Sequence, residues 1–317
     1  MKKVTIPKTG LTVSNICYGA AYCAFEDEDK YFKCLDCFVE KGGNFIDTAN
    51  IYGKWFAHKT NSNEVMLGKW MRSRKNRGDI VLASKAAHPE LATMNIPRMT
   101  YEQITSDLEE SLAALQVPYV DILWLHRDAE NIAVGEIMEI LFSIHKSGKA
   151  RYFGCSNWKP GRISEAVSYA EQKGEKGFIA SQPQWSLAVP NKSGADDKTA
   201  YRMDAEGLEL HRRTGLTAIP YSSQAGGFFT KYDNNTASKA LLERYENKEN
   251  MRVYANMKSL SGKTGYCCTE ISLAYLMSHE FTVIPIIGSK TPEQISDSVS
   301  AADIRLTGEE IAFLGGI

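Results

Sequence analysis

The chain has 317 residues, and its 37 Lys and Arg against 38 Asp and Glu give a formal net charge of -1 at pH 7. This balance argues against a nucleic-acid partner, because neutralising several phosphates requires a clustered excess of basic residues. The longest basic cluster, residues 72–77, is typical of a solvated surface turn. A composition with 43% hydrophobic and 24% charged residues is that of a globular chain rather than a disordered or fibrous one.

We expect neither a targeting segment nor a membrane span. Lys2 and Lys3 are followed by Pro7 and Gly10, which interrupt any apolar h-region. The apolar stretch 281–287 is far shorter than the roughly 18 residues of a membrane helix. The sequence therefore predicts a cytoplasmic protein without a membrane partner.

The seven Cys residues are an odd number, which suits free thiols in a reducing compartment better than a disulfide framework. Cys34 and Cys37 form a C-x-x-C within a segment of helical periodicity. Two small apolar residues at this spacing are more often part of a core than of a redox or metal site, although the sequence does not decide the point.

A hairpin is predicted around residues 8–10, and after it short apolar runs alternate with amphipathic segments. The predicted strands are 16–20, 44–49, 80–86, 119–126, 150–156, 178–184, 217–223 and 281–288. The predicted helices are 29–41, 62–72, 101–115, 135–146, 161–172, 204–213, 269–278 and 292–302. Most strands are apolar at successive positions, as expected for parallel strands buried on both faces.

Helix starts are well marked, since Thr100–Gln103 and Thr291–Gln294 both read as capping boxes. About 45 residues separate the seventh strand from the next full helix, and so long a connection is usually functional or contains small elements. We expect an active-site loop at Gly226-Gly227 and one extra helix in this connection.

Eight βα units without a linker predict a single (β/α)8 TIM barrel over residues 1–317. A doubly wound sheet is the competing architecture. It would place G-x-G-x-x-G in the first βα turn, and residues 18–25 lack that pattern.

In such barrels the chemistry lies at the carboxyl ends of the strands. Asp47, Lys85 and His126 end the second, third and fourth predicted strands, and Tyr52 follows Asp47 closely. Each residue alone is explained as well by a rim side chain whose hydrogen bonds are made within the protein. Here, however, three neighbouring strands place an acid, a cation and an imidazole at the same rim.

A buried unpaired charge is strongly unfavourable, so Asp47 and Lys85 are expected to form an ion pair. The Lys85 ammonium can also face Tyr52. At about 4 Å and an effective dielectric near 20, one charge is worth roughly 4 kcal/mol. As an upper limit, this would lower the pKa of a phenol from about 10 towards 7, where it could act as a general acid.

These residues resemble the aldo-keto reductase family. The resemblance is carried by Phe45–Gly53 (FIDTANIYG), by Lys85 in Ala83-Ser-Lys and by His126 in Leu123-Trp-Leu-His. It extends from Gly10–Ser14 through Ser156-Asn157 to Gly288–Gln294. The family's Asp, Tyr, Lys and His tetrad corresponds to Asp47, Tyr52, Lys85 and His126 without substitution.

The resemblance implies NADP-dependent reduction of a small-molecule aldehyde or ketone, with NAD the less favoured cofactor. Tyr52 would protonate the forming alkoxide. Lys85, paired with Asp47, would lower the pKa of Tyr52, and His126 would orient or polarise the carbonyl.

The resemblance also implies the cofactor contacts. Ser156, Asn157 and Gln182 would hydrogen-bond the nicotinamide carboxamide, and Tyr221, followed by Ser222, would stack on the ring. Gly226 and Gly227 would let the backbone approach the pyrophosphate.

The segment Gly288–Pro292 precedes the last predicted helix, whose N-terminus attracts anions. Ser289 and Lys290 could hold a 2'-phosphate there, which favours NADP over NAD. By resemblance Gln294 would reach the adenine, with Asp297 nearby. The sequence departs from the family pattern at Ser298, where many relatives have Asn, and this puts adenine contacts at that position in doubt.

An aromatic substrate cleft is suggested by Trp55, Phe56, Trp158 and Trp185, although aromatic residues near barrel ends are also routine packing. His58, Lys59 and Arg127 could meet an anionic group. The sequence does not choose between aliphatic, sugar, steroid and xenobiotic carbonyls, and it leaves the oligomeric state and the physiological direction open.

The sequence permits comparison with three other functions. An NADP-binding regulatory or sensor module with little turnover is the main alternative. A metal-dependent hydrolase using Asp47, His126 and His211 is disfavoured because no H-x-H or H-E-x-x-H spacing occurs, so no metal is expected. A serine hydrolase is disfavoured because no G-x-S-x-G elbow is present.

Overall fold

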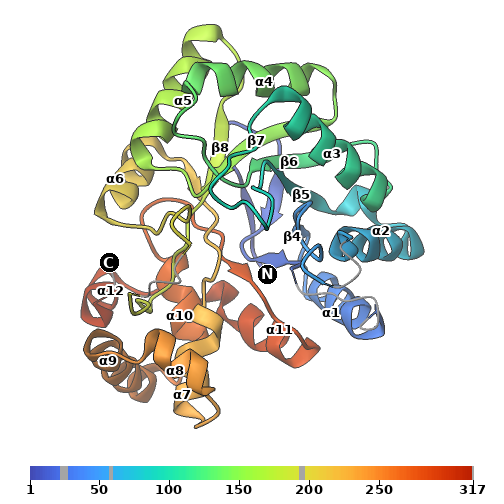
Figure 1. The fold of residues 1–317 in the computed structure, drawn as a ribbon. Coiled ribbons are helices and arrows are strands. Elements are labelled where there is room, and N and C mark those ends of the chain that lie inside the picture. Colours follow the sequence, from blue (N-terminus) through green and yellow to red (C-terminus); the bar gives the residue numbers. More distant parts are fainter. Residues whose placement is uncertain (22–27, 57–59, 193–196, 316–317) are drawn as a thin grey trace.

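The computed structural model describes residues 1–21, 28–56, 60–192 and 197–315. Eight strands form one sheet in which every neighbouring pair is parallel. Sheet order follows chain order except that the last strand lies beside the first, so the sheet curls round on itself (Figure 1). In sheet order the strands are β10 (Ile286–Ile287), β3 (Cys17–Gly19), β4 (Phe45–Asp47), β5 (Val81–Ala86), β6 (Val120–Leu125), β7 (Ala150–Ser156), β8 (Phe178–Gln182) and β9 (Thr217–Ala218).

Contacts between β9 and the segment before β10 close the barrel. Ala218 pairs with Val283 in a parallel bridge, and the Ala218 carbonyl accepts a hydrogen bond from Ile284 N at 2.9 Å. Both strands are shorter than predicted because Pro220 and Pro285 have no N–H to donate to a neighbouring strand. The predicted (β/α)8 barrel is confirmed.

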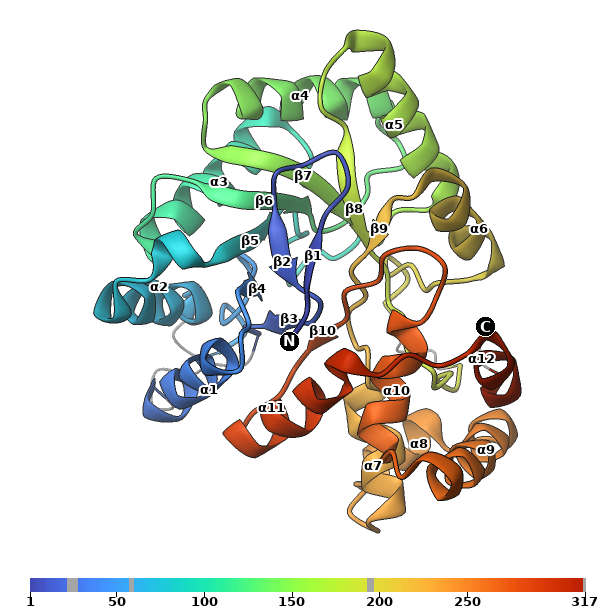
Figure 2. The ribbon, with the colours of Figure 1, turned by 180° about the vertical axis from the view of Figure 1, so that it is seen from behind.

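The predicted N-terminal hairpin is also confirmed, as β1 (Lys3–Thr5) and β2 (Thr12–Ser14). Ser14 N donates to the side chain of Asn44, directly before β4, at 2.7 Å. Ile6, Leu11 and Val13 are buried in the same cluster as the barrel interior. The hairpin therefore covers the amino ends of the strands (Figure 2) and leaves the carboxyl ends for the chemistry.

The eight predicted helices are present, with ends that differ by at most a few residues. They are α1 (Glu28–Glu40), α2 (Ser62–Arg74), α3 (Tyr101–Leu115), α4 (Val134–Lys146), α5 (Pro160–Lys173), α6 (Ala205–Thr214), α10 (Cys268–Met277) and α11 (Pro292–Val299). The last continues as the 3-10 helix η4 (Ser300–Asp303). Another short 3-10 helix, η2 (Arg77–Asp79), precedes β5.

One of the two predicted capping boxes forms completely. Thr100 accepts from Gln103 N, and the Gln103 side chain accepts from Thr100 N at 3.1 Å. At α11 the Thr291 side chain accepts from Gln294 N, but the Gln294 side chain accepts from Lys290 N at 2.8 Å instead. The second box is therefore only half formed, because its Gln binds the preceding loop.

The prediction of one extra helix after the seventh strand is wrong. The connection contains η3 (Ala225–Gly227), α7 (Phe228–Asp233), α8 (Lys239–Tyr245) and α9 (Lys248–Thr264), and α12 (Gly308–Leu314) follows later. Helices as short as α7 and α8 are marginal in isolation. Here Phe228, Tyr245 and Val253 are buried in one cluster with α10, so packing stabilises elements that local periodicity does not reveal.

Candidate active site

The predicted tetrad assembles at the carboxyl ends of adjacent strands. Lys85 in β5 donates hydrogen bonds to the Asp47 carboxylate at the end of β4 and to the Thr48 carbonyl, the latter at 2.8 Å. His126 directly follows β6, and its backbone N–H donates to the Ala86 carbonyl at 2.8 Å. The expected Asp47–Lys85 ion pair is present, and both side chains are only 3% exposed.

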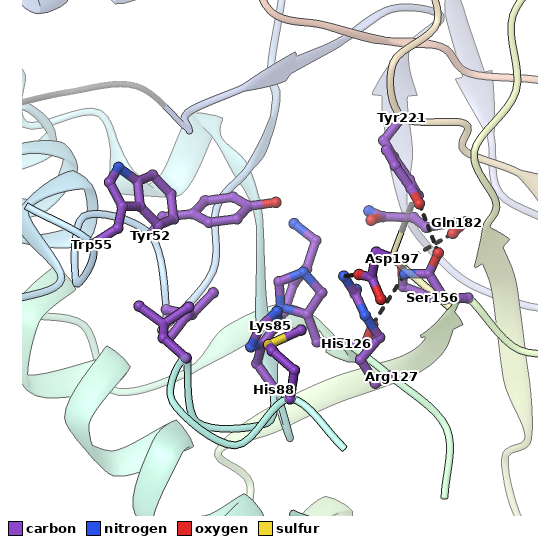
Figure 3. A pocket seen from close by; sticks show the side chains of 14 residues that line it. Tyr52, Trp55, Lys85, His88, His126, Arg127, Ser156, Gln182, Asp197 and Tyr221 are labelled. Atoms are coloured by element: carbon purple, nitrogen blue, oxygen red, sulfur yellow. Dashed lines mark hydrogen bonds and ion pairs between the residues drawn. The ribbon is translucent and has the colours of Figure 1, made fainter. Parts of the chain in front are cut away.

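Tyr52 lies beside both the cation and the imidazole. Lys85 Nζ lies 4.8 Å from the Tyr52 ring centroid, and the Tyr52 and His126 rings meet edge to face with centroids 5.8 Å apart. Figure 3 shows Tyr52 and Trp55 on one side of the pocket and Tyr221 on the other, with Lys85 and His126 between them. A carbonyl group in this space would meet a phenol and an imidazole together.

Burial and charge oppose each other at Tyr52. Burial raises the pKa of the Tyr52 phenol, and Lys85 acts in the opposite direction without reversing that shift. The expectation that Lys85 brings this pKa below its ordinary value is therefore wrong for the protein alone, because desolvation outweighs one nearby ammonium. Lys85 itself keeps its proton: although burial acts to lower the pKa of Lys85, the charge of Asp47 raises it above the ordinary value.

His126 is a neutral imidazole. Burial lowers its pKa well below the ordinary value, and the positive charge of Arg127 acts in the same direction. His126 Nδ1 is buried and has no hydrogen-bond partner among the described residues. A neutral ring lets His126 polarise a carbonyl group without adding a second cation beside Lys85.

Gln182, at the end of β8, connects the tetrad to the predicted nicotinamide residues. Its Nε2 donates to Asp47 Oδ1 at 2.8 Å, and its backbone carbonyl accepts from Ser156 Oγ at 3.0 Å. Gln182 Oε1 is buried and lacks a hydrogen-bond partner in the part of the chain that the structure describes. An unpartnered acceptor of this kind fits a carboxamide N–H donor such as that of nicotinamide.

Asn157 behaves differently from Gln182. Its Nδ2 donates to the His126 carbonyl at 3.2 Å and to Ser156 Oγ at 3.0 Å, while Oδ1 accepts from the Tyr221 hydroxyl at 2.7 Å and from Tyr201 N at 3.1 Å. Both amide hydrogens and both lone pairs are thus used within the chain. A bond from Asn157 to the carboxamide, as the resemblance implies, requires one of these contacts to be exchanged.

Tyr221 follows β9 and lines the pocket, as stacking on a nicotinamide ring requires. Burial raises the pKa of Tyr221 to about 12, so this phenol is neutral. Ser222 beside it is exposed and has a left-handed backbone with φ of 53°. This turn redirects the chain from β9 into the loop that leads to Gly226 and Gly227.

The loop after β9 is hydrogen-bonded to the last turn of α11, which in turn contacts the segment before that helix. Gln224 Nε2 donates to Ser298 Oγ at 3.3 Å, and Ser298 also lies 3.3 Å from Ser289 Oγ. Gly226 and Gly227 have φ of 67° and 80°, which glycine adopts without strain. Gln224 was not singled out from the sequence, because no local pattern reveals a contact with a residue so distant in the chain.

The other residues predicted to hold the cofactor's phosphates and adenine lie around the start of α11. Gly288, Lys290 and Gln294 are exposed, and Ser289 is buried. Gln294 in turn accepts from Lys290 N through its side chain. The predicted residues are thus together at one helix start, with Gln294 holding the loop rather than extending freely towards an adenine.

The pocket in front of the tetrad has a volume of about 350 Å³. Three residues of the tetrad line it, namely Tyr52, Lys85 and His126, together with the nicotinamide residues and with Ile51, Trp55, His88, Leu91, Met94, Arg127 and Asp197. The predicted aromatic lining is wrong for two tryptophans: Trp158 and Trp185 are each 1% exposed and belong to the outer core clusters. These two tryptophans are therefore core residues and do not contact the pocket.

Arg127 is not available as a simple anion site. Its guanidinium pairs with Asp197 at 2.8 Å and donates to Thr199 Oγ1 at 2.8 Å. His58 and Lys59, the other residues considered for an anionic group, lie outside the described residues. Asp197 and Tyr201 come from the connection between β8 and α6, which the sequence did not mark as part of the site.

Within the described ranges, no group of three or more His, Cys, Asp or Glu side chains could hold a metal ion. No helix in the same ranges is long and apolar enough to cross a membrane. Cys34 is buried in α1, and Cys37 is partly buried on the same helix, both as free thiols.

An eight-stranded parallel barrel with an Asp–Lys–Tyr–His cluster at its carboxyl rim has the architecture of the (β/α)8-barrel enzymes, whose sites lie at that rim. Residues 15–316 match the model of the aldo/keto reductase family. The chain belongs to that family and is an oxidoreductase. The family match also supports a nicotinamide cofactor and a small-molecule carbonyl substrate.

Three relatives illustrate the range of similar proteins. The chain is 28% identical to norsolorinic acid reductase B of Aspergillus parasiticus, over 96% of the chain and 81% of that protein. It is 27% identical to the putative aryl-alcohol dehydrogenase AAD14 of Saccharomyces cerevisiae, over 99% and 86%. It is 28% identical to the uncharacterized oxidoreductase YrpG of Bacillus subtilis, over 100% and 96%.

Proposed function

We propose that the protein is an NADP-dependent carbonyl reductase in which Tyr52 donates the proton. The observation that supports this most directly is the placement of Lys85 between the Asp47 carboxylate and the Tyr52 ring. A protonated phenol beside a buried, permanently charged ammonium can release its proton to a developing alkoxide, because the ammonium stabilises the tyrosinate that remains.

In this proposal each residue of the tetrad has a separate role. Tyr52 holds the proton on its hydroxyl until negative charge develops on the carbonyl oxygen, and Lys85 then stabilises the phenolate. His126, as a neutral ring, donates through Nε2 to the same oxygen, since its Nδ1 has no partner and the proton is better placed on the nitrogen that faces the pocket. Asp47 keeps Lys85 charged.

The nicotinamide supplies the hydride when it is bound. Gln182 Oε1 and Ser156 would hold its carboxamide, and Tyr221 would lie against the ring. Ser289 and Lys290, supported by Gly227, Gly288 and Gln294, would hold the phosphate groups. A basic Lys290 at the start of α11 favours the 2'-phosphate of NADP over NAD.

Tyr52→Phe tests the acid. This substitution removes one hydroxyl and keeps the ring beside Lys85 and His126. We expect kcat for carbonyl reduction to fall by about 10²–10⁴-fold, with the NADPH dissociation constant unchanged by fluorescence titration. Undiminished turnover in this variant would remove Tyr52 from the mechanism.

The alternative of an NADP-binding sensor makes a different prediction. Such a module would bind NADPH but reduce none of a broad panel of aliphatic, aromatic, sugar and steroid carbonyls. The intact tetrad favours the enzyme, since a sensor has no need of a buried ion pair next to a phenol. Assaying the panel with NADPH and NADH in parallel separates the two functions and reports the cofactor preference.

A further inference from the structure

His88 is a second imidazole in the pocket, and the proposed mechanism does not use it. It follows β5 by two residues and lines the cavity beside the tetrad. Its ring meets that of His126 edge to face, with centroids 4.7 Å apart. Figure 3 shows both rings among the side chains that surround the cavity. Any substrate whose carbonyl oxygen reaches His126 therefore passes close to His88.

The hydrogen bond at Nδ1 determines what His88 can offer a ligand. His88 Nδ1 lies 2.7 Å from the Pro89 carbonyl oxygen, which can only accept, so Nδ1 carries the proton. Burial lowers the pKa of His88 to about 4, which keeps the ring neutral near pH 7. Nε2 is then a lone-pair acceptor, and no group in the described part of the chain hydrogen-bonds to it.

The loop that carries His88 is held by an ion pair between partly buried Arg98 and buried Asp107. Ala87 has a left-handed backbone with φ of 64°, and its N–H donates to Asp107 Oδ2 at 2.9 Å. Arg98 pairs with Asp107 at 2.7 Å and donates to the His88 carbonyl at 3.2 Å. Strained backbone of this kind persists only where surrounding contacts maintain it. The same network fixes the position of the His88 ring.

The rest of the cavity wall carries little net charge. Lys85 is neutralised by Asp47, and Arg127 by Asp197. Leu91 and Met94 provide apolar surface next to His88. Among the described residues of the wall, a charged group on the substrate would therefore find no unpaired opposite charge, whereas a neutral donor would find the Nε2 acceptor.

We propose that His88 is a specificity-determining residue that accepts a hydrogen bond from a substrate hydroxyl, so that the site selects neutral carbonyl compounds with a hydroxyl near the carbonyl. A hydroxyl group is a neutral donor of the kind that this acceptor can bind. The proposal rests on the proposed carbonyl reductase function, because it places the substrate in the same pocket.

The test compares the three positional isomers of hydroxybenzaldehyde with their methyl ethers and with unsubstituted benzaldehyde. Binding is followed by quenching of tryptophan fluorescence, and turnover by NADPH oxidation. We expect at least one hydroxybenzaldehyde to bind about tenfold better than its ether, and His88→Phe to remove this preference while keeping the ring packed on His126. His88→Gln, which retains an acceptor near the Nε2 position, should restore part of it.

His145→Phe is the matched control, since His145 lies on α4 with its ring against Phe153 and away from the pocket. It should keep the wild-type preference. Absence of any hydroxyl preference in the wild-type protein, or a preference that survives in His88→Phe, would overturn the proposal. Binding preference without turnover would refute the reductase function and support the role of His88, so the two failures are distinguishable.

Discussion

Single residues in this site act through their immediate surroundings rather than through their identity alone. The ammonium of Lys85 lies against the Tyr52 ring, yet burial keeps the pKa of the phenol above its ordinary value. Asn157 lies at a strand end, where an amide suits cofactor binding, but its hydrogen-bonding groups are already used. Residue-scale predictions therefore depend on contacts that only the folded chain contains.

Lys290 is predicted to determine the cofactor preference. Removing its charge with Lys290→Ala should lower kcat/KM for NADPH by about tenfold, because a charge-assisted hydrogen bond to a phosphate is lost. The value for NADH should change little, since NADH has no 2'-phosphate. Steady-state kinetics with both cofactors make the measurement. An equal loss of kcat/KM for the two cofactors would mean that Lys290 supports the loop conformation and does not bind the 2'-phosphate.

Glu64, fully buried at the start of α2, makes stability depend on pH. Burial raises its pKa to about 7, although Ser84 and Asn61 donate hydrogen bonds to the carboxylate at 2.5 Å and 2.8 Å. The folded-state pKa lies above the unfolded value, so the folded state binds more protons between the two. The free energy of unfolding should therefore fall by about 3 kcal/mol as the pH rises through this window.

Glu64→Gln removes this titration and should flatten the change of the denaturation midpoint between about pH 4 and about pH 8, a range that contains the whole window from 4.5 to about 7. Urea unfolding of both proteins at several pH values makes the comparison. Glu165→Gln is the control, because Glu165 is exposed on α5 and its substitution should leave the wild-type slope in place. A slope unchanged in Glu64→Gln would mean that other groups cause it.

At the scale of elements, caps and breaks in the sequence set the ends of helices and strands. Thr100 forms a complete capping box at α3, and Pro220 and Pro285 shorten β9 and β10. Gln294 shows the limit of such patterns, since its side chain binds the loop before the helix instead of completing the box. A capping pattern therefore predicts where a helix begins more reliably than it predicts each hydrogen bond.

Thr100→Ala should destabilise α3 and lower the free energy of unfolding by about 1 kcal/mol, because Gln103 N loses its acceptor. Denaturant titration measures the change. Thr100→Ser is the matched control, since it retains the hydroxyl and should stay close to the wild type. Equal losses in both variants would assign the effect to the methyl group and not to the cap.

At the scale of the whole molecule, the hairpin closes one end of the barrel and contributes to stability, and the opposite end carries the candidate active site. The hairpin places Leu11 and Val13 against the barrel interior, while Asp47, Lys85 and His126 lie at the opposite ends of the strands. Two outer clusters of apolar residues hold the helices to the sheet. Changes at the hairpin should therefore affect stability and leave the chemistry intact.

Leu11→Ala tests this separation. Leu11 is 3% exposed, so the substitution should leave a cavity and cost about 2–5 kcal/mol of stability. The kcat/KM measured well below the unfolding temperature should stay within about twofold of the wild type, as for changes distant from the reacting groups. Ile96→Ala, at 55% exposure, should change stability by less than about 0.5 kcal/mol. A large loss of activity in folded Leu11→Ala would show that the two ends are coupled.

The sequence by itself determined the eight βα units, the hairpin and the strand ends that carry Asp47, Lys85 and His126, because hydrophobic periodicity and helix signals act over a few neighbouring residues. Tertiary structure alone decided the helices after β9, the burial of Trp158 and Trp185, the net pKa shift of Tyr52 and the presence of His88 in the pocket. These features depend on packing and desolvation by residues far apart in the chain, and no local pattern encodes that proximity.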